Sequence, residues 1–241
     1  MIIYHKYLSY SVVLKTIFLT FFLGLSTMFW PIKIYANPVP RTENGTEDTT
    51  PGGTRGDCLY ADQKPLTALI PETNKRQELT LAAHPTIFIY VPENGAKAAE
   101  FILVDSDNKI LYENIVLLPD TAGVIDVTIP TNAPELKIGK NYNWTFALIC
   151  ESTSPEAFVK GSIQRINPTP DLAKNLQQTP ESDRWLIYSQ AGIWHETLLT
   201  LAQQVRSHPN DTKITSQWKN LLNSVGLSNV ATEPLKQLPK E

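Results

Sequence analysis

A segment near the middle of the chain, in which large apolar residues recur at every second position, most constrains the fold. Asn143 and Thr145 are polar, and the positions on either side of each are apolar. The apolar positions in this alternation are Tyr142, Trp144, Phe146, Leu148 and Cys150. Successive side chains of a strand point to opposite faces, so this pattern predicts a strand with one buried face. Eighteen prolines among 241 residues argue against a helical bundle, because proline removes a backbone donor and breaks helices.

Short β-branched and aromatic runs surround this segment, and Pro, Gly, Asn or Asp separates most of them. They are residues 86–91, 101–104, 110–112, 124–129 and 158–166, with weaker candidates at 66–70 and 78–82. Asp105–Lys109, rich in turn-forming residues, is predicted to connect two of these runs as a hairpin. Seven or eight short strands of this kind predict a sandwich or a barrel.

Leu136, Gly139 and Tyr142 have the spacing of the tyrosine corner of immunoglobulin-like and fibronectin-like sandwiches. In that corner the tyrosine hydroxyl bonds to the backbone a few residues upstream. The predicted fold is therefore mainly β, with an immunoglobulin/fibronectin-like antiparallel β-sandwich over residues 58–167. Tyr142 and Trp144 are core residues in this interpretation, and stacking on a ligand is the alternative.

Beyond residue 167 the apolar period changes from two to 3.6, which predicts a helical subdomain over residues 168–228. Thr179-Pro180-Glu181 is typical of a helix start, and Gly192 is expected to end that helix. Two further amphipathic stripes run from Trp194 to Val205 and from Trp218 to Val225. About three helices are therefore expected, followed by a loose tail over residues 229–241.

The N-terminal residues have the character of an export signal. Residues 1–36 contain three lysines and no acidic residue, and residues 16–30 are uncharged and mostly apolar. A transmembrane helix needs about 20 such residues, so this run suits a signal-peptide core better. Residues 1–36 are predicted to be a signal peptide. One alternative is an uncleaved membrane anchor, whose apolar span residues 11–14 would lengthen. The other alternative is a buried core helix. Residues 37–57 contain one large aliphatic side chain and are predicted to be a disordered linker.

Export would place the two cysteines of the chain in an oxidising compartment. Cys58 and Cys150 are then expected to form a disulfide bond. The closed loop of about 90 residues corresponds to a stabilisation of up to about 4.5 kcal/mol in the chain-entropy model. Two unpaired buried thiols are the alternative. Two cysteines cannot supply a disulfide-dense scaffold or a four-cysteine zinc site.

Charge and motifs exclude several functions. The net charge of −3 gives no basic surface for nucleic acid, and removal of the signal lysines would make it −6. His195-Glu196 begins like a His-Glu-x-x-His zinc motif, but position 199 is leucine, so a polar pair on a helix surface is expected. Asp105–Asn108 begins like a calcium loop, but Lys109 and Ile110 do not fit one, which favours a turn. No catalytic residue, metal site or cofactor is assigned.

Two sets of residues remain as candidate binding sites. Arg55 and Asp57 form a polar cluster beside Cys58, where glycines could expose the arginine to a carboxylate or a sugar hydroxyl. The favoured alternative is that Arg55 binds backbone carbonyls where the linker enters the sandwich. Trp185, Trp194 and Trp218 are the second set, because three tryptophans exceed what a small helical subdomain usually hides. They are either partner-facing anchors or core residues.

Several short motifs occur in one order along the chain. They are Gly53-Thr54-Arg55-Gly56-Asp57-Cys58, Leu69-Ile70-Pro71, Tyr90-Val91-Pro92, Leu136…Gly139…Tyr142-x-Trp144…Cys150, Gly161-x-Ile163-x-Arg165 and Gly192-Ile193-Trp194. As a set they resemble an uncharacterised cyanobacterial family, catalogued as domain of unknown function number 928, over residues 53–227. The pair His195-Glu196 departs from the family pattern, which has an aromatic residue and an aspartate there. The resemblance implies an exported envelope protein and supplies no activity.

These features predict an exported, periplasmic or extracellular protein of the cell envelope that acts as a non-enzymatic binding module. Its expected partner is another envelope protein or a glycan, and it would contact a membrane only through an uncleaved signal segment. An envelope hydrolase without a recognisable motif, such as a glycan-active enzyme, is one alternative. An accessory factor for a larger secreted surface protein is the other.

Overall fold

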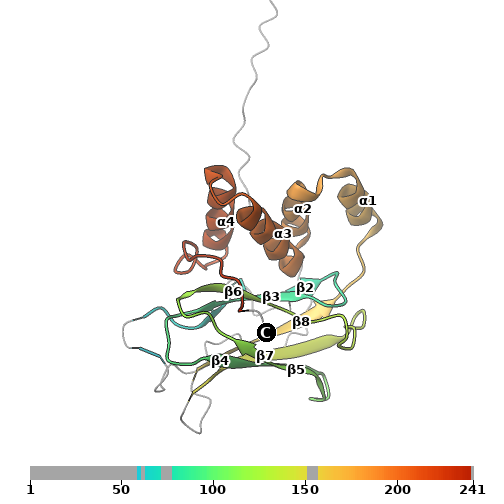
Figure 1. Ribbon diagram of the computed structural model, residues 1–241. Coiled ribbons are helices and arrows are strands. Elements are labelled where there is room, and N and C mark those ends of the chain that lie inside the picture. The colour runs from blue at the N-terminus through green and yellow to red at the C-terminus, as the bar shows by residue number, and fades with distance from the viewer. Residues whose placement is uncertain (1–58, 61–62, 72–77, 151–156, 240–241) are drawn as a thin grey trace, which may run out of the picture. The chain divides into compact units, whose positions relative to one another are not determined.

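The computed structural model describes residues 59–60, 63–71, 78–150 and 157–239. Within these residues the protein is mainly β: two sheets come first along the chain, and four α-helices follow (Figure 1). The predicted signal peptide, residues 1–36, and the predicted linker, residues 37–57, lie outside the described residues. None of the helices that the structure describes is long and apolar enough to cross a membrane.

The larger sheet has five strands in the order β2-β8-β7-β4-β5. They are β2 (Glu78–Thr80), β4 (Ala98–Asp105), β5 (Ile110–Leu117), β7 (Asn141–Ile149) and β8 (Phe158–Arg165). All neighbouring strands are antiparallel except β2 and β8, which run parallel. The expectation of a purely antiparallel sandwich is therefore corrected. The short β2 strand joins the sheet after a long connection, so no hairpin dictates its direction.

The smaller sheet has three antiparallel strands in the order β1-β3-β6. They are β1 (Thr67–Ala68), β3 (Thr86–Val91) and β6 (Gly123–Thr128). All six residues of β3 are buried, although a strand with one wet face would alternate. Ile87, Ile89 and Val91 pack toward the larger sheet, whereas Phe88 and Tyr90 pack among the helices. The smaller sheet is thus the middle of three layers (Figure 1).

The predicted hairpin turn between β4 and β5 is confirmed. The Asp105 N–H donates to the Lys109 carbonyl at 3.0 Å. The Asp105 carboxylate accepts from the backbone N–H groups of Asp107 at 2.9 Å and Lys109 at 3.0 Å. Asn108 takes the left-handed conformation with φ of 60°. The carboxylate that suggested a calcium loop therefore holds the turn itself.

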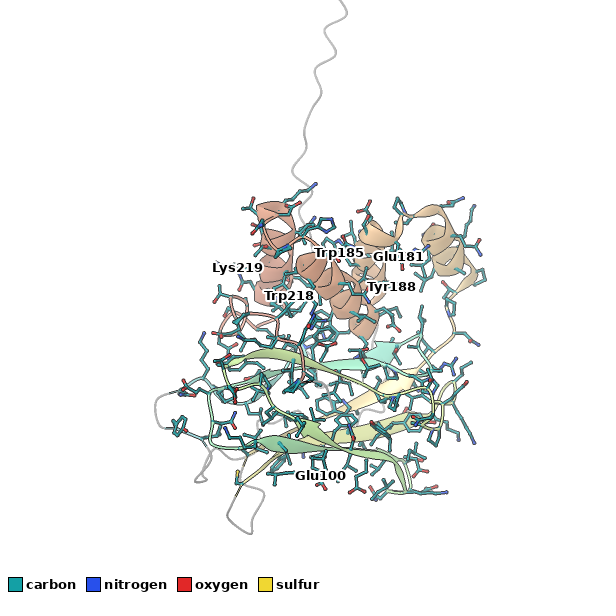
Figure 2. All side chains as sticks on the ribbon, in the orientation of Figure 1. Glu100, Glu181, Trp185, Tyr188, Trp218 and Lys219 are labelled. Atoms are coloured by element: carbon teal, nitrogen blue, oxygen red, sulfur yellow. The ribbon has the colours of Figure 1, made fainter. Side chains whose placement is uncertain are left out.

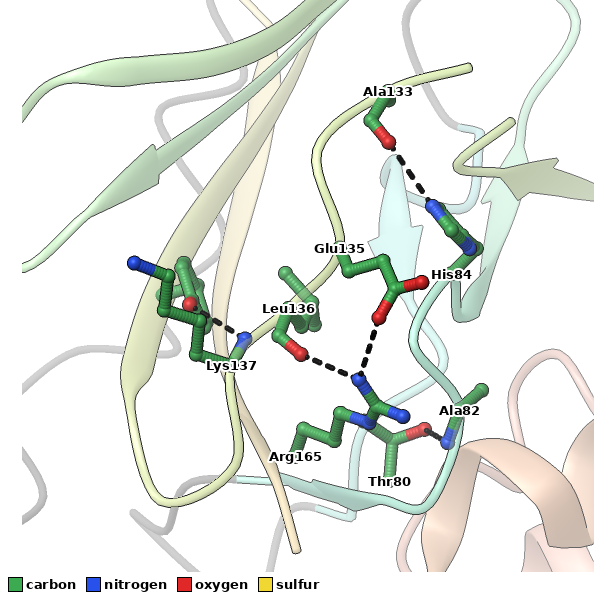
Figure 3. A network of polar contacts seen from close by, with 9 residues as sticks. Thr80, Ala82, His84, Ala133, Glu135, Leu136, Lys137 and Arg165 are labelled. Carbon is green, nitrogen blue, oxygen red and sulfur yellow. Dashed lines mark hydrogen bonds and ion pairs between the residues drawn. The ribbon is translucent and has the colours of Figure 1, made fainter. Parts of the chain in front are cut away.

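Tyr142 makes the backbone contact expected of a tyrosine corner. Its hydroxyl accepts from the Lys137 N–H at 2.8 Å. Arg165 closes the same loop from β8, because its guanidinium donates to the Leu136 carbonyl at 2.8 Å and pairs with Glu135 at 3.3 Å (Figure 3). Gly139 has φ of 74°, a conformation that favours glycine. The loop before β7 is therefore anchored to two strands of the larger sheet.

The helices are α1 (Pro170–Gln178), α2 (Arg184–Ala191), α3 (Trp194–Ser207) and α4 (Thr212–Ser224), with a short 3₁₀ turn at Glu181–Asp183. Four helices replace the expected three. Thr169 caps α1 by accepting from the Leu172 N–H, and Pro170 begins the helix. Thr179 and Pro180 instead lie between α1 and the 3₁₀ turn. The same Thr-Pro-acid signature occurs twice, and the earlier copy starts an α-helix.

Residues 229–239 pack against the smaller sheet, which corrects the expectation of a loose tail. The Val124 N–H donates to the Pro234 carbonyl, and the Lys236 N–H donates to the Val124 carbonyl, both at 2.8 Å. Val230 and Ala231 are buried among the helices. The outer edge of β6 offers free backbone groups, and this C-terminal segment satisfies them.

Candidate ligand-binding groove

A groove of about 670 Å³ lies between α3, α4 and the C-terminal segment. Its apolar lining consists of Val205, Pro209, Trp218, Ala231, Pro234 and Leu235. Its polar lining consists of Arg206, Thr215, Lys219, Thr232, Glu233 and Gln237. This volume falls in the range of small-ligand sites, which combine apolar groups with a few polar ones.

Arg206 holds the groove wall in place. It projects from the last turn of α3 and forms an ion pair with Asp126 of β6. The same nitrogen, Nη2, lies 3.4 Å from the Lys236 carbonyl. Its Nε atom has no acceptor among the described residues. One guanidinium therefore connects a helix, a strand and the C-terminal segment, and places a positive charge on the groove.

Trp218 and Lys219 are adjacent on α4 but occupy different environments (Figure 2). Trp218 is 3% exposed and packs against Phe88 with a ring-centroid separation of 6.2 Å and a tilt of 59°. Lys219 is exposed and forms no ion pair with a described residue. The groove thus has an indole at its base and, at its rim, an ammonium group that forms no ion pair with a described residue.

Glu233 is the single carboxylate of the groove lining among the described residues. It forms an ion pair with Lys64. Burial, with a contribution from the nearby Glu233 charge, raises the pKa of Tyr90. Glycoside hydrolysis needs two cooperating carboxyl groups, and this lining supplies one, which is already paired. The described lining therefore lacks the pair of carboxyl groups on which glycoside hydrolysis depends.

A second polar cluster lies where α3 meets the end of β2 in the larger sheet. One oxygen of Glu196, Oε1, accepts from the Thr80 hydroxyl at 2.7 Å, the Leu81 N–H at 2.8 Å and the Ala82 N–H at 2.9 Å. Burial raises the pKa of Glu196, and these hydrogen bonds oppose the shift. Glu196 thus accepts hydrogen bonds from the backbone N–H groups that directly follow β2, which is a structural role for the carboxylate.

His195 is buried beside this cluster, and its Nδ1–H donates to the Thr86 carbonyl at 3.1 Å. Burial lowers the pKa of His195 to about 4, so the imidazole is neutral near pH 7. Its Nε2 atom has no partner among the described residues. Both His195 and Glu196 pack against strands, which corrects the expectation of a polar pair on a helix surface. No group of three or more potential metal ligands occurs in the described part of the chain.

The three candidate tryptophans are packed inside the protein. Trp185, Trp194 and Trp218 are 5%, 8% and 3% exposed. The Trp194 indole N–H donates to the Leu69 carbonyl at 2.7 Å, which joins α3 to the segment after β1. The helical stripes cover the outer face of the smaller sheet, so these rings form the interface between two layers. The three tryptophans are therefore core residues, and the expectation that they face a partner is corrected.

The other predicted site residues are only partly described. Arg55, Asp57 and Cys58 lie outside the described residues, so the polar cluster and the disulfide bond stay predictions. Cys150 directly follows β7 and packs against the core of the sandwich. The groove residues Arg206, Lys219 and Glu233 were not expected from the sequence. They belong to no motif, and their proximity depends on a C-terminal segment that was expected to be loose.

Several motifs that carry the family resemblance have structural explanations. Gly161 lies beneath Trp144, and a Cβ atom there would approach the Trp144 Cζ2 atom to 2.6 Å. Gly192 takes the left-handed conformation that ends α2, and Trp194 then begins α3. The motif residues in the described part of the chain therefore connect layers and shape turns, whereas the groove lies outside the motifs.

The chain matches the family model of Domain of Unknown Function (DUF928) over residues 50–235. It therefore belongs to this family, which confirms the resemblance inferred from the motifs. None of the curated proteins matches the chain.

Proposed function

We propose that the protein is an exported, non-enzymatic binding module of the cell envelope, and that its groove holds a short acidic segment of another envelope protein. The observation that carries this proposal is the groove lining. Apolar side chains such as Val205, Pro209 and Leu235 offer contacts for an extended segment. Lys219 offers a cation that no described carboxylate neutralises. An acidic side chain is the natural complement of that cation.

A peptide fits this groove better than a glycan. Sugar recognition relies on an exposed aromatic face, and Trp218 is 3% exposed with its ring packed toward Phe88. The single, paired carboxylate of the lining also gives no support to the hydrolase alternative. A role as accessory factor is compatible with peptide binding, and the peptide would then belong to a larger secreted surface protein.

The proposed location follows from the N-terminal residues. The basic, acid-free start, the short apolar run and Ala36 before Asn37-Pro38 support export and cleavage near residue 36. We also propose that the two sheets form an immunoglobulin/fibronectin-like sandwich. The hydrogen bond between Tyr142 and Lys137 supports this finer assignment, because it matches the tyrosine corner of those folds.

The test is a charge-exchange binding experiment on the purified protein. Fluorescence anisotropy would compare an apolar peptide carrying aspartates with the same peptide carrying lysines. We expect the acidic peptide to bind preferentially, and Lys219→Glu to weaken its binding about tenfold, because a contact with the attracting cation becomes a repulsion. The same substitution should improve binding of the lysine peptide.

Lys174→Glu is the matched control, since Lys174 is exposed on α1, outside the groove lining, and has no ion pair with a described residue. It makes the same change in net charge and should leave both affinities unchanged. Equal effects of the two substitutions would contradict a specific site at the groove. Binding of an acidic oligosaccharide in place of the acidic peptide would assign the groove to glycans instead.

A further inference from the structure

The strand β5 forms an open edge of the larger sheet. It pairs with β4 and is the last strand of this sheet among the described residues. Edge strands of natural proteins are usually short, or they carry lysine or proline that blocks further pairing. β5 spans Ile110–Leu117, contains neither residue type, and has Glu113 as its single charged side chain. The β4–β5 register shifts between Leu103 and Val104, near the start of β5, and the strand beyond that shift carries no lysine or proline that would block another strand.

The direction of the free backbone groups follows from one hydrogen bond. The Leu118 N–H donates to the Lys97 carbonyl at 3.0 Å, directly beyond the paired positions Leu117 and Ala98. Hydrogen-bonding direction alternates along an antiparallel strand. Val116 and Asn114 therefore bond toward β4, whereas the backbone groups of Glu113, Ile115 and Leu117 point toward the open edge.

The side chains of β5 are unusually apolar for an exposed strand. Ile110, Ile115 and Leu117 are 52%, 47% and 42% exposed, and they make up half of the large hydrophobic side chains that are exposed in the described part of the chain. The strand register places Leu117 beside Ala98, and Ala98 beside the exposed Ile149. The apolar surface thus continues from the edge across the outer face, on which Glu100 also lies (Figure 2).

We propose that the β5 edge is a dimer interface, in which a second copy of this chain adds its own β5 strand antiparallel across a two-fold axis near Ile115. Ile115 then faces Ile115 of the second copy, and Glu113 faces Leu117 of the second copy. Lys109 precedes the strand and Asp120 follows it, so antiparallel pairing brings opposite charges to each end. Asp120 also lies 3.8 Å from Lys97 of its own chain, and both side chains are exposed. The edge is self-complementary, as a two-fold interface requires.

The charge pattern selects this register. A shift that moves the axis to Glu113 would place the two Glu113 carboxylates directly opposite each other, which is unfavourable. Pairing across Ile115 joins the two larger sheets into one continuous sheet and extends the apolar outer face. The groove lies in the helical layer, on the far side of the smaller sheet, so this dimer leaves it open. The interface is therefore separate from the proposed ligand site.

The first test is the mass of the purified protein in solution, measured by light scattering over a range of concentrations. We expect a dimer. Ile115→Lys should weaken dimerisation at least about tenfold, because it places two ammonium groups opposite each other at the axis. Its thermal midpoint at a concentration where both proteins are monomeric should match that of the unmodified protein. Ile138→Lys changes an isoleucine of 52% exposure outside β5 and should leave the dimer intact.

Hydrogen exchange identifies the edge directly. The amides of Glu113, Ile115 and Leu117 should be protected in the dimer and should exchange rapidly in Ile115→Lys, apart from the substituted position itself. The Val116 amide should stay protected in both, because it bonds to β4. A monomer at all concentrations, or a dimer that Ile115→Lys does not disrupt, would overturn the proposal. Protection that arises only when a different protein is added would assign the edge to a strand from that protein.

Discussion

At the scale of single residues, two buried titratable groups oppose each other in their effect on stability. The pKa of His195 falls from 6.5 to about 4 on folding because burial disfavours the charged ring. Between these values the unfolded state binds more protons than the folded state, so stability falls as the pH falls. The shift corresponds to a loss of roughly 3 kcal/mol once the pH is below about 4.

Glu78 acts in the other direction. Burial raises its pKa well above 4.5, and its Oε2 atom has no partner among the described residues. The folded state therefore keeps a proton that the unfolded state releases, and stability falls as the pH rises from 4.5 through the raised pKa. Together with His195, this carboxyl group places the greatest stability in mildly acidic solution.

Replacement of this carboxyl group should remove its share of the loss at high pH, to which Glu196, whose pKa burial also raises, contributes in the same direction. We expect Glu78→Gln to be more stable than the unmodified protein by an amount that grows between about pH 5 and about pH 8, because glutamine stays neutral. Urea unfolding across this range measures the difference. Glu181→Gln, at an exposed position, is the control and should show no such trend. A constant difference at every pH would mean that Glu78 does not titrate as described.

His195 and Glu196 illustrate that a sequence pattern does not show whether a polar side chain is buried. His195-Glu196 has leucine at position 199, where a His-Glu-x-x-His zinc motif needs its second histidine. Placing the pair on a helix surface was wrong, because Thr80, Leu81 and Ala82 supply donors from a segment more than 100 residues away. Polarity alone does not distinguish a solvated side chain from one whose partners arrive through the tertiary fold.

At the scale of elements, the C-terminal segment has the largest effect on the candidate site. It contributes half of the residues that line the groove and covers the edge of β6. Its sequence has no amphipathic period, so it was expected to be loose. The segment is ordered through backbone hydrogen bonds to Val124 and burial of Val230 and Ala231. Neither contact requires a repeating pattern.

Removal of this segment should therefore destabilise the whole protein. A chain that ends at Asn229 loses the burial of Val230 and Ala231 and the hydrogen bonds to Val124, at a cost of about 2–4 kcal/mol. The thermal midpoint should fall by about 10 °C, as measured by circular dichroism. A chain that ends at Pro239 is the control and should match the full-length protein. An unchanged midpoint after the longer deletion would contradict a structural role for the segment.

At the scale of the whole molecule, the predicted disulfide bond would join the residue before Leu59 to the residue that follows β7. Leu59 forms a bridge with Asn94, four residues before Ala98, and Ala98 lies opposite Ile149. Leu59 and Ile149 therefore belong to the same end of the larger sheet. Cys58 precedes Leu59 in the sequence, and Cys150 follows Ile149. Cys58 lies outside the described residues, so the bond stays a prediction, which requires the two Cα atoms to lie within about 7 Å of each other.

The bond is tested by a thiol assay on the protein purified from the envelope under denaturing, non-reducing conditions. We expect no reactive thiol before reduction. Cys150→Ser should lower the thermal midpoint by several degrees, because it releases a loop of about 90 residues in the unfolded state. The reductant-treated protein should show the same midpoint as this variant. Two reactive thiols before reduction would contradict both the bond and the argument from an oxidising compartment.

The sequence alone determined the elements whose information is local. Alternation from Tyr142 to Cys150 predicted β7, the Asp105–Lys109 turn predicted a hairpin, and the apolar stripes predicted helices that end at Gly192 and near Gly226. Each depends on the period of a strand or helix, or on the φ angle that a residue tolerates.

Only the tertiary structure decided how the layers combine. The helices cover the smaller sheet, which buries both faces of β3 and encloses the three tryptophans. The groove exists because Arg206, Lys219 and Glu233 meet across a helix, a second helix and the C-terminal segment. Apolar periodicity shows which face of an element is covered, but not which other element covers it. The contacts between distant segments therefore become known only from the packing of the folded chain.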